Sequence, residues 1–437
     1  MGYRVVRTIS EAKSVGRGSP SRDSGSFLPE GAGAPQPAEP WKAILAGGQA
    51  RFNGMADIGS PAIVTYAFAP EKGAGIQRAV ADTALVAGMH AGVTAAETAA
   101  GVRFVEVDAD ADPMISVEYI TDGSGWSWAH YPSVSTGSPN SRGSLLMGDT
   151  MTDFSPGAWG FEILLHELGH ALGLKHPHEG APRLDTGLDD SAHTVMSYNR
   201  MEAPQEAYRP FDVAALRHLY GGPATLDGVV THYRAATDVV VAKGTAGGDT
   251  LIGVNGVTVL KGLGGNDVLI ARAADDRLVG GPGHDWLSGS DGRDVLMGGR
   301  GNDTLGGGSG NDRLDGWTGR DVLCGGGGKD LLDGGGGHDR LNGGLGADTL
   351  IGGRGDDVYR GGPGADVFDA GRGHDVVVDF DPREGDRIDI ADLDLSASEA
   401  ADRLVVTRGD LVLDTGTGTL TLQGAADHGH GDWLFIA

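Results

Sequence analysis

An aspartate returns at every ninth residue between Asp267 and Asp375, without a gap, and this period constrains the fold more than any other feature. An apolar residue stands two places after each aspartate, beginning with Leu269 and ending with Val377. Most of the aspartates follow the pattern Gly-Gly-x-Gly-x, as in residues 298–303. A flexible glycine-rich linker needs neither a strict period nor a regular apolar position. The pattern therefore predicts a repeat structure whose units share one conformation.

A unit of nine residues fits a six-residue turn followed by a three-residue strand, and two units would return the chain to the same edge. Residues 18 apart would then stack, so that Asp267 begins one ladder of carboxylates and Asp276 begins a second on the opposite edge. Stacked strands lie about 4.8 Å apart, where carboxylates repel each other unless a cation lies between them. Ca²⁺ accepts about six to eight hard oxygens, and glycine turns can aim carbonyls at it. We expect a parallel β-roll with calcium in its turns.

The expected calcium ligands are aspartates of both ladders and glycines of the turns. They are Asp267, Asp285, Asp294, Asp303, Asp312, Asp321, Asp330, Asp339, Asp348, Asp357, Asp366, Asp375, Gly280, Gly281, Gly283, Gly298, Gly299 and Gly301. Asp276 is left out because residues 271–276 contain no glycine, and Trp317 replaces a turn glycine before Asp321, which weakens the expectation there. Thr258 stands at the aspartate position, so the array is expected to fray at its start. The pattern resembles the RTX nonapeptide repeat.

A second motif, HELGHALGLKH, begins at His166. On a helix, His166 and His170 lie one turn apart on the same face, where two imidazoles can reach one Zn²⁺. Gly173 would let the chain leave the helix, so that His176 supplies a third nitrogen. The fourth position would stay open for water, and Glu167 would take the proton of that water as it attacks a peptide carbonyl. The alternative, a core helix with incidental histidines, is disfavoured because it would bury polar groups without a purpose.

This motif resembles that of the metzincin zinc metalloproteases, and Pro177 after the third histidine resembles their serralysin branch. Residues 194–198 are similar to the Met-turn of that family. The resemblance implies that Met196 forms a hydrophobic floor under the zinc ligands. It also implies that Tyr198 ligates zinc and swings to stabilise the transition-state oxyanion; the alternative is a packed or surface tyrosine. Residues 211–221 are similar to the helix that closes the protease domain.

Several other segments have a clear secondary-structure pattern. We expect strands at 61–68, 104–107 and 115–119 and helices at 77–100, 162–172 and 211–220. Residues 126–132 precede the zinc motif; they form either a cleft strand that pairs with substrate, as in proteases that this chain resembles, or part of the core. His178 and His193 fit no ligand position and are expected at the surface.

These patterns divide the chain into four parts. Residues 1–40 are expected to be disordered, or a propeptide by their position in the resemblance, and 41–235 the protease domain. Residues 236–380 are expected to form the RTX roll and 381–437 a C-terminal β segment with the secretion signal. The fold class is thus an α+β metzincin protease domain followed by an all-β parallel β-roll.

The composition narrows the range of partners. The chain of 437 residues has 60 acidic and 34 basic residues and a net charge of −26, so it should repel nucleic acid and anionic membranes. Cys324 is the single cysteine, which excludes an intramolecular disulfide. No apolar run is long enough for a transmembrane helix, and residues 1–40 lack the apolar stretch of a signal peptide. We expect a monomer without stable membrane insertion.

The function expected from these features is that of a secreted zinc-dependent endopeptidase that acts on proteins and peptides. It would hold one catalytic Zn²⁺ and several structural Ca²⁺. Its resemblance to RTX proteins implies export by a type I ABC exporter, with an uncleaved signal at residues 432–437. One alternative is a calcium-dependent adhesion or surface-layer protein with a vestigial protease domain. A pore-forming toxin is a third possibility, and the absence of a long apolar segment counts against it.

Overall fold

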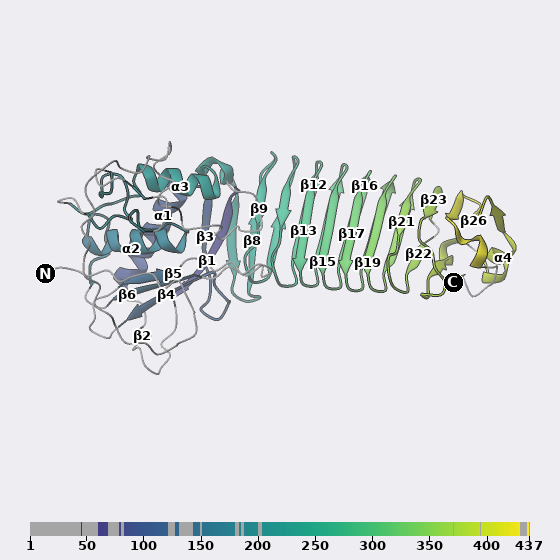
Figure 1. Ribbon diagram of the computed structural model, residues 1–437, viewed down its shortest axis with the longest axis horizontal. Coiled ribbons are helices and arrows are strands. Elements are labelled where there is room, and N and C mark those ends of the chain that lie inside the picture. Colours follow the sequence, from purple (N-terminus) through teal and green to yellow (C-terminus); the bar gives the residue numbers. More distant parts are fainter. Residues whose placement is uncertain are drawn as a thin grey trace, which may run out of the picture.

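The computed structural model in Figure 1 has an α/β part followed by a long β-roll. It describes residues 45, 60–68, 78–79, 83–120, 127–130, 143–148, 151–179, 183–184, 188–199, 203–369, 371–393, 395–428 and 435–436. Residues 1–40, residues 126, 131 and 132 of the predicted segment 126–132 and most of the predicted signal at 432–437 lie outside this description. One continuous hydrophobic core joins the two parts.

The α/β part is built on a six-stranded sheet. Its strands are β1 (Ala62–Phe68), β2 (Arg78–Ala79), β3 (Val102–Glu106), β4 (Ile115–Ile120), β5 (Trp128–His130) and β6 (Gly143–Gly148). The order is β3-β1-β4-β6-β5, with β2 beside β4. The first four strands of this order are parallel to one another, whereas β5 is antiparallel to β6 and ends the sheet. The three strand predictions are confirmed.

Helices α1 (Thr83–Ala99), α2 (Trp159–Ala171) and α3 (Pro210–Tyr220) cover this sheet (Figure 1), and the 3-10 helix η2 (Pro223–Leu226) follows. The predicted helix at 77–100 begins only at Thr83, because Arg78 and Ala79 pair with β4 as a short strand. α1 packs against α2, and a Cβ at Gly92 of α1 would lie 3.6 Å from Leu164 of α2. This close approach fixes the zinc-motif helix against the core. None of the helices in the described part is long and apolar enough to cross a membrane.

The roll consists of two eleven-stranded sheets, in which each coil contributes one strand to each sheet. The first roll sheet contains β7 (Val230–Arg234), β8 (Val239–Lys243), β10 (Thr258–Lys261), β12 (Arg277–Pro282), β14 (Val295–Arg300), β16 (Arg313–Gly319), β18 (Leu331–Gly337), β20 (Thr349–Arg354), β22 (Val367–Asp369), β24 (Arg387–Asp389) and β28 (Phe435–Ile436). The second roll sheet contains β9 (Thr250–Ile252), β11 (Val268–Ile270), β13 (Trp286–Asp291), β15 (Thr304–Ser309), β17 (Val322–Gly327), β19 (Arg340–Leu345), β21 (Val358–Arg360), β23 (His374–Val377), β27 (Thr419–Leu422), β26 (Asp410–Asp414) and β25 (Leu404–Thr407).

Successive strands of the array pair in parallel with a register of 18 residues, as predicted: Leu278 pairs with Leu296, which pairs with Leu314. The apolar residues two places after each ladder aspartate are at most 1% exposed and form the thin core of the roll. Most strands in the middle of the array are six residues long rather than three. The reason is that turn glycines also pair with their equivalents in the next coil, as Gly281 does with Gly299.

The repeat ends after residue 378, and a short cap follows. In the second roll sheet β27 continues parallel to β23, and β26 and β25 then add antiparallel strands. The helix α4 (Ala397–Asp402) and the 3-10 helices η3 (Ala391–Leu393) and η4 (Ala425–His428) complete the cap. Ser396 begins α4 with a capping box that it shares with Glu399.

The junction between the two parts holds a buried arginine. Arg272 is the largest of the fully buried side chains in the described part of the chain, at 2% exposure. Its Nε donates a hydrogen bond of 2.8 Å to the carbonyl of Gly253. Burial lowers the pKa of Arg272 to about 10, and the nearby Tyr220 of α3 opposes this shift. The guanidinium therefore lies between the first coils of the roll and the α/β part.

Candidate metal sites

Three histidines meet at the C-terminal end of α2. His166 and His170 lie on this helix, which Leu172 caps. Gly173 follows with φ of 98°, a left-handed conformation that glycine adopts without strain. The chain then turns back, and the amide of Leu174 donates to the carbonyl of Gly169 over 2.9 Å. His176 is thereby brought beside the two helix histidines, as predicted.

The three imidazoles point their Nε2 atoms at one another. Nε2 of His176 lies 3.1 Å from Nε2 of His166 and 3.0 Å from Nε2 of His170. Nδ1 of His166 and Nδ1 of His170 each lie 2.7 Å from a backbone carbonyl, which can only accept a hydrogen bond, so each Nδ1 is the donor. Their Nε2 lone pairs therefore face the shared centre. Tetrahedral Zn²⁺ with Zn–N bonds of about 2.0–2.1 Å separates its nitrogens by roughly 3.3 Å, so this donor set fits the ion.

The electrostatics of the cluster favour neutral imidazoles. Burial, with a smaller contribution from the neighbouring His176, lowers the pKa of His170 to about 3. Burial also lowers the pKa of His176 to about 2, with contributions from His166 and His178. Nδ1 of His176 lies 3.0 Å from Oε1 of Glu179, a carboxylate that can orient the ring. Neutral imidazole is the form that binds metal.

Glu167 lies beside the first histidine and is 1% exposed. Burial raises the pKa of Glu167 to about 8, and a hydrogen bond from the backbone amide of Ala129 opposes that shift. Oε1 is buried without a hydrogen-bond partner among the described residues. One carboxylate oxygen is thus held by β5, and the other remains available to a proton donor.

The predicted Met-turn lies against α2. Met196 is fully buried, and a Cβ at Gly169 would lie 2.7 Å from its sulfur, so the methionine packs directly on the helix. Tyr198 is 39% exposed, and its hydroxyl lies 2.6 Å from Nε2 of His176. Its ring stacks on that of His166 at 5.7 Å. The structure therefore brings Met196 against α2 and the hydroxyl of Tyr198 against the histidine cluster.

One buried carboxylate holds this turn in place, and it was predicted only as a helix start signal. Asp212, in the first turn of α3, accepts hydrogen bonds from the hydroxyl of Thr194 at 2.5 Å and from the amide of Val195 at 2.9 Å. It also accepts from the amide of Arg209 at 2.9 Å. The capping pattern in the sequence is real, but the contact with the Met-turn arises only in the tertiary structure.

Two other histidines considered in the sequence, His178 and His193, lie outside the three-histidine centre. His193 is partly exposed and pairs with Asp190 over 2.7 Å, in agreement with a surface position. His178 is about half exposed and stacks on His176 at 5.4 Å. The rings of His176 and His178 and the carboxylate of Glu179 could share an ion, a grouping that the sequence did not predict.

The ladder aspartates of the roll share one arrangement. Oδ1 of each accepts the backbone amide of the ladder residue 18 positions earlier, as Asp285 does from Asp267 over 2.8 Å. Oδ2 is buried and has no hydrogen-bond partner among the described residues at Asp267, Asp276, Asp285, Asp294, Asp303, Asp312, Asp321, Asp330, Asp339, Asp348, Asp357, Asp366 and Asp375. Each coil therefore presents bare carboxylate oxygens that a cation would satisfy.

The turn glycines leave room beside these oxygens. A Cβ at Gly298 would lie 2.5 Å from Oδ2 of Asp303, and Gly299 and Gly301 have φ of 119° and 132°. Two substituted turns keep this shape: Trp317 has φ of 70° and Ala274 has φ of 131°. Asp276, which was left out of the expected ligands, shows the same bare Oδ2 as the others. The backbone turn at residues 271–276 therefore forms without glycine and places its carboxylate oxygen as the other units do.

Burial governs the titration of both ladders. It raises the pKa of Asp303 to about 6 and that of Asp294 to about 7, and the stacked aspartates add to both shifts. At Asp276 burial raises the pKa to about 8. Carboxyls in this position are costly to ionise unless a cation binds them.

Comparison with known families identifies these repeats. Residues 243–273, 252–287, 288–323, 325–359 and 343–377 match the model of the RTX calcium-binding nonapeptide repeat. The C-terminal region is an RTX calcium-binding β-solenoid. Its aspartate ladders and turn glycines are the features that bind Ca²⁺ in such repeats. The matched segments leave the histidine cluster outside, and no curated protein matches the chain.

Proposed function

We propose that this chain is a zinc-dependent endopeptidase of the serralysin-type metzincin class, stabilised by its calcium-binding RTX roll. The observation that carries the proposal is the convergence of three Nε2 atoms at about 3 Å beside a buried glutamate. A calcium-dependent adhesion protein with a vestigial protease domain needs none of these residues. The presence of His166, Glu167 and Tyr198 together favours the enzyme.

The residues that would hold zinc are His166, His170 and His176, with Tyr198 close enough to be a further ligand. When bound, zinc supplies a Lewis acid that polarises a carbonyl and lowers the pKa of water. Burial excludes bulk water from the three rings. The carbonyls that accept from Nδ1 of the helix histidines keep their rings oriented.

Glu167 is the proposed general base. Its Oε1 takes the proton of the attacking water, holds it, and delivers it to the nitrogen of the leaving amine. The amide of Ala129 fixes the other end of the carboxylate. The raised pKa of Glu167 suits a group that both accepts and donates a proton near neutral pH.

Tyr198 is the proposed oxyanion donor. Its hydroxyl lies 2.6 Å from the nitrogen of a zinc ligand, and its ring is partly exposed. A phenol in this position can donate a hydrogen bond to the oxygen that becomes negative as water adds to the peptide carbon.

β5 is the proposed substrate strand. It ends the sheet order and pairs with β6 on one side. Within the described part of the chain no strand pairs with the other edge of β5, and such an edge can receive an extended peptide through backbone hydrogen bonds. Ala129 of β5 also holds Glu167, so a peptide added here would lie beside the general base.

The proposed setting is extracellular. RTX repeats suit a protein that folds where calcium is abundant, and the net charge of −26 suits a chain that binds many cations. Export by a type I ABC exporter, an uncleaved signal at 432–437 and a monomeric state remain predictions that accompany this proposal.

The test combines metal analysis with proteolysis. The purified chain should contain one zinc in addition to calcium and should digest casein. Glu167→Ala should retain zinc and lose nearly all digestion, because the residue is not a ligand in this mechanism. Calcium without zinc, or proteolysis that survives in Glu167→Ala, would overturn the proposal.

A further inference from the structure

The two roll sheets differ in the charge of their outer faces. The outward positions lie one and three places after each ladder aspartate, since side chains alternate along a strand. On the first roll sheet these positions include Asp315, Asp333 and Asp369. On the second roll sheet, from β11 to β23, they include no acidic residue, and the charged residues are Arg340 and Arg360. One face of a chain with a net charge of −26 is therefore apolar and basic.

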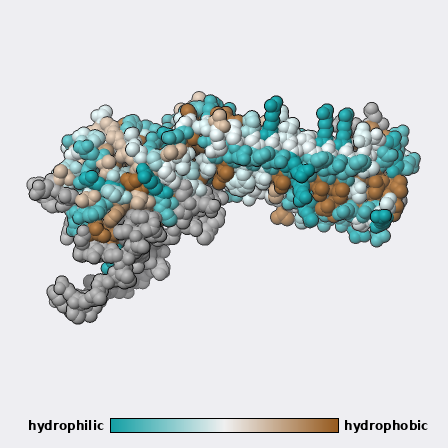
Figure 2. Space-filling view, turned by 90° about the horizontal axis from the view of Figure 1, so that it is seen from above, coloured by the Kyte–Doolittle hydropathy of each residue, from teal (hydrophilic) through white to brown (hydrophobic). Residues whose placement is uncertain are grey.

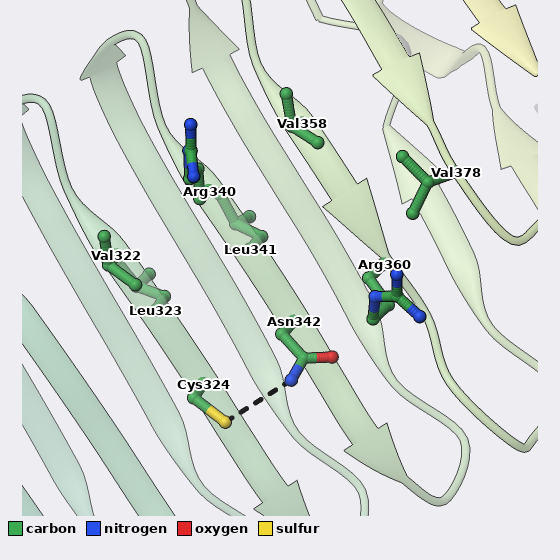
Figure 3. Close-up of a pocket in the computed structure, with 9 residues that line it drawn as sticks. All are labelled: Val322, Leu323, Cys324, Arg340, Leu341, Asn342, Val358, Arg360 and Val378. Atoms are coloured by element: carbon green, nitrogen blue, oxygen red, sulfur yellow. Dashed lines mark hydrogen bonds between the residues drawn. The ribbon is translucent and has the colours of Figure 1, made fainter.

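A groove of about 470 Å³ lies on this face, across β17, β19 and β21 (Figure 3). One wall is formed by Val322, Arg340 and Val358, which are register partners on the three strands. Val322 is 43% exposed and Val358 is 38% exposed, so this wall is apolar on either side of the arginine.

The opposite wall contains Cys324, Arg360 and Val378 (Figure 3). Each wall therefore has one arginine and at least one apolar side chain. Figure 2 shows brown, apolar patches along the C-terminal half of the roll, with hydrophilic side chains between them. The volume lies within the range of about 300–1,000 Å³ that is usual for small-molecule pockets.

The strands beneath the groove limit what can bind there. β19 is paired with β17 on one side and with β21 on the other, so its backbone groups are satisfied. An extended peptide cannot add as a further strand here. A ligand in this groove must therefore bind through side chains. It needs an anionic group to pair with the arginines and an apolar group to pack on the valines.

We propose that this groove binds an aliphatic carboxylate. Guanidinium groups of Arg340 and Arg360 approach the carboxylate from opposite walls, where each can form charge-assisted hydrogen bonds. The alkyl chain covers Val322, Val358 and Val378 and removes their apolar surface from water. This site is independent of the histidine cluster and of the proposed protease activity.

Cys324 provides a direct test, because it is the single cysteine of the chain and lines the groove. The full-length protein, loaded with calcium, is alkylated with iodoacetamide in the presence of octanoate. We expect octanoate to slow alkylation in a saturable manner. Octyltrimethylammonium and octyl glucoside carry the same alkyl chain without a carboxylate and should leave the rate nearly unchanged.

Arginine variants distinguish octanoate binding to the two groove arginines from nonspecific adsorption. Arg340→Gln and Arg360→Gln should each weaken octanoate protection about threefold, and together roughly tenfold, which is typical of exposed ion pairs. Arg313→Gln, on the outer face of the first roll sheet, is the matched control and should leave protection unchanged. Each alkylation rate is compared with that of the same variant without octanoate, because a nearby arginine also changes the reactivity of the Cys324 thiol.

Three results would overturn the proposal. Equal protection by all three octyl compounds would indicate apolar adsorption only. Undiminished protection in the double variant would show that the arginines do not bind the carboxylate. Protection that rises with protein concentration alone would show that a second copy of the chain covers this face.

Discussion

Tyr220 donates a hydrogen bond of 3.0 Å to the backbone carbonyl of Leu172, the residue that caps the helix carrying the first two histidines. Tyr220 in turn lies near the buried guanidinium of Arg272, whose backbone amide donates to the ladder residue Asp276. The end of the zinc-motif helix is therefore connected to the first coils of the roll through buried groups.

Tyr220→Phe should lower the free energy of unfolding by about 1 kcal/mol, because it removes one buried hydrogen bond and keeps the ring. Urea unfolding in saturating calcium measures the change. Tyr233→Phe is the control, since the hydroxyl of Tyr233 is exposed and its hydrogen-bond partners among the described residues are Asp108 and Asp238. Equal losses in the two variants would contradict the role given to the Leu172 contact.

Asp212→Asn should change how stability depends on pH. Burial raises the pKa of Asp212 from 3.8 to about 6, so the folded state favours the protonated carboxyl. The stability from this proton is fully present below about pH 3.8 and is lost as the pH rises through 6. Asparagine does not titrate, so the variant does not undergo this loss. As the pH rises from 4 to 7, the free energy of unfolding of the variant should therefore increase by up to about 3 kcal/mol relative to that of the unmodified protein. A constant difference between the two proteins across this range would refute the assignment.

Tyr198→Phe should reduce kcat about a hundredfold and leave KM and zinc content nearly unchanged, because a hydrogen bond to the developing oxyanion acts in the transition state. Steady-state kinetics with a peptide substrate and a zinc assay measure both effects. A parallel loss of zinc would instead make Tyr198 mainly a ligand.

Calcium removal should unfold the roll. The segment from Val230 to the C-terminus, which begins at β7, should be largely disordered in excess chelator, because bare ladder oxygens repel and one core residue per nine does not offset the backbone entropy. Calcium should restore a β-sheet circular dichroism spectrum cooperatively, since each coil depends on its neighbours. A β spectrum that persists in chelator would contradict this dependence.

Trp317→Gly should stabilise the calcium-loaded roll by about 1 kcal/mol. Trp317 has φ of 70°, a left-handed conformation that costs a residue with a Cβ roughly 1–2 kcal/mol. Thr318→Gly, in the same turn at an ordinary φ, is the control and should destabilise. Thermal unfolding at fixed calcium compares the two, and a loss of stability in Trp317→Gly would mean that the indole contributes more than the strain costs.

The sequence predicted the roll well because a strict period determines which residues stack. The pairing of Leu278 with Leu296, the buried apolar rows and the two ladders all follow from a spacing of nine. Asp276 was left out of the expected calcium ligands because its turn lacks glycine, yet that turn forms with the same bare Oδ2 as the others. The coils stacked on either side impose their backbone conformation on a unit that lacks the turn glycines. The sequence of that unit alone does not reveal this effect.

The histidine cluster was predictable because its spacing is local: His166 and His170 lie one turn apart on α2, and His176 follows shortly after the helix ends. Asp212 and Arg272 were not recognised, since both act across elements distant in the sequence. Asp212 appeared as a helix start signal, and its contact with Thr194 depends on how α3 packs. Arg272 has a charged side chain of a type that is usually exposed, and only the junction between the two parts explains its burial.

The register of 18 residues gives the array a parity. Each unit of nine residues crosses from one sheet to the other. The cap depends on that alternation, because β27 pairs with β23 in the second roll sheet and β24 pairs with β22 in the first. Deleting one unit would send every later strand to the wrong sheet and turn the cap over. Deleting two adjacent units would only shorten the roll by one coil. A chain built this way can lengthen or shorten without loss of its cap only in even steps.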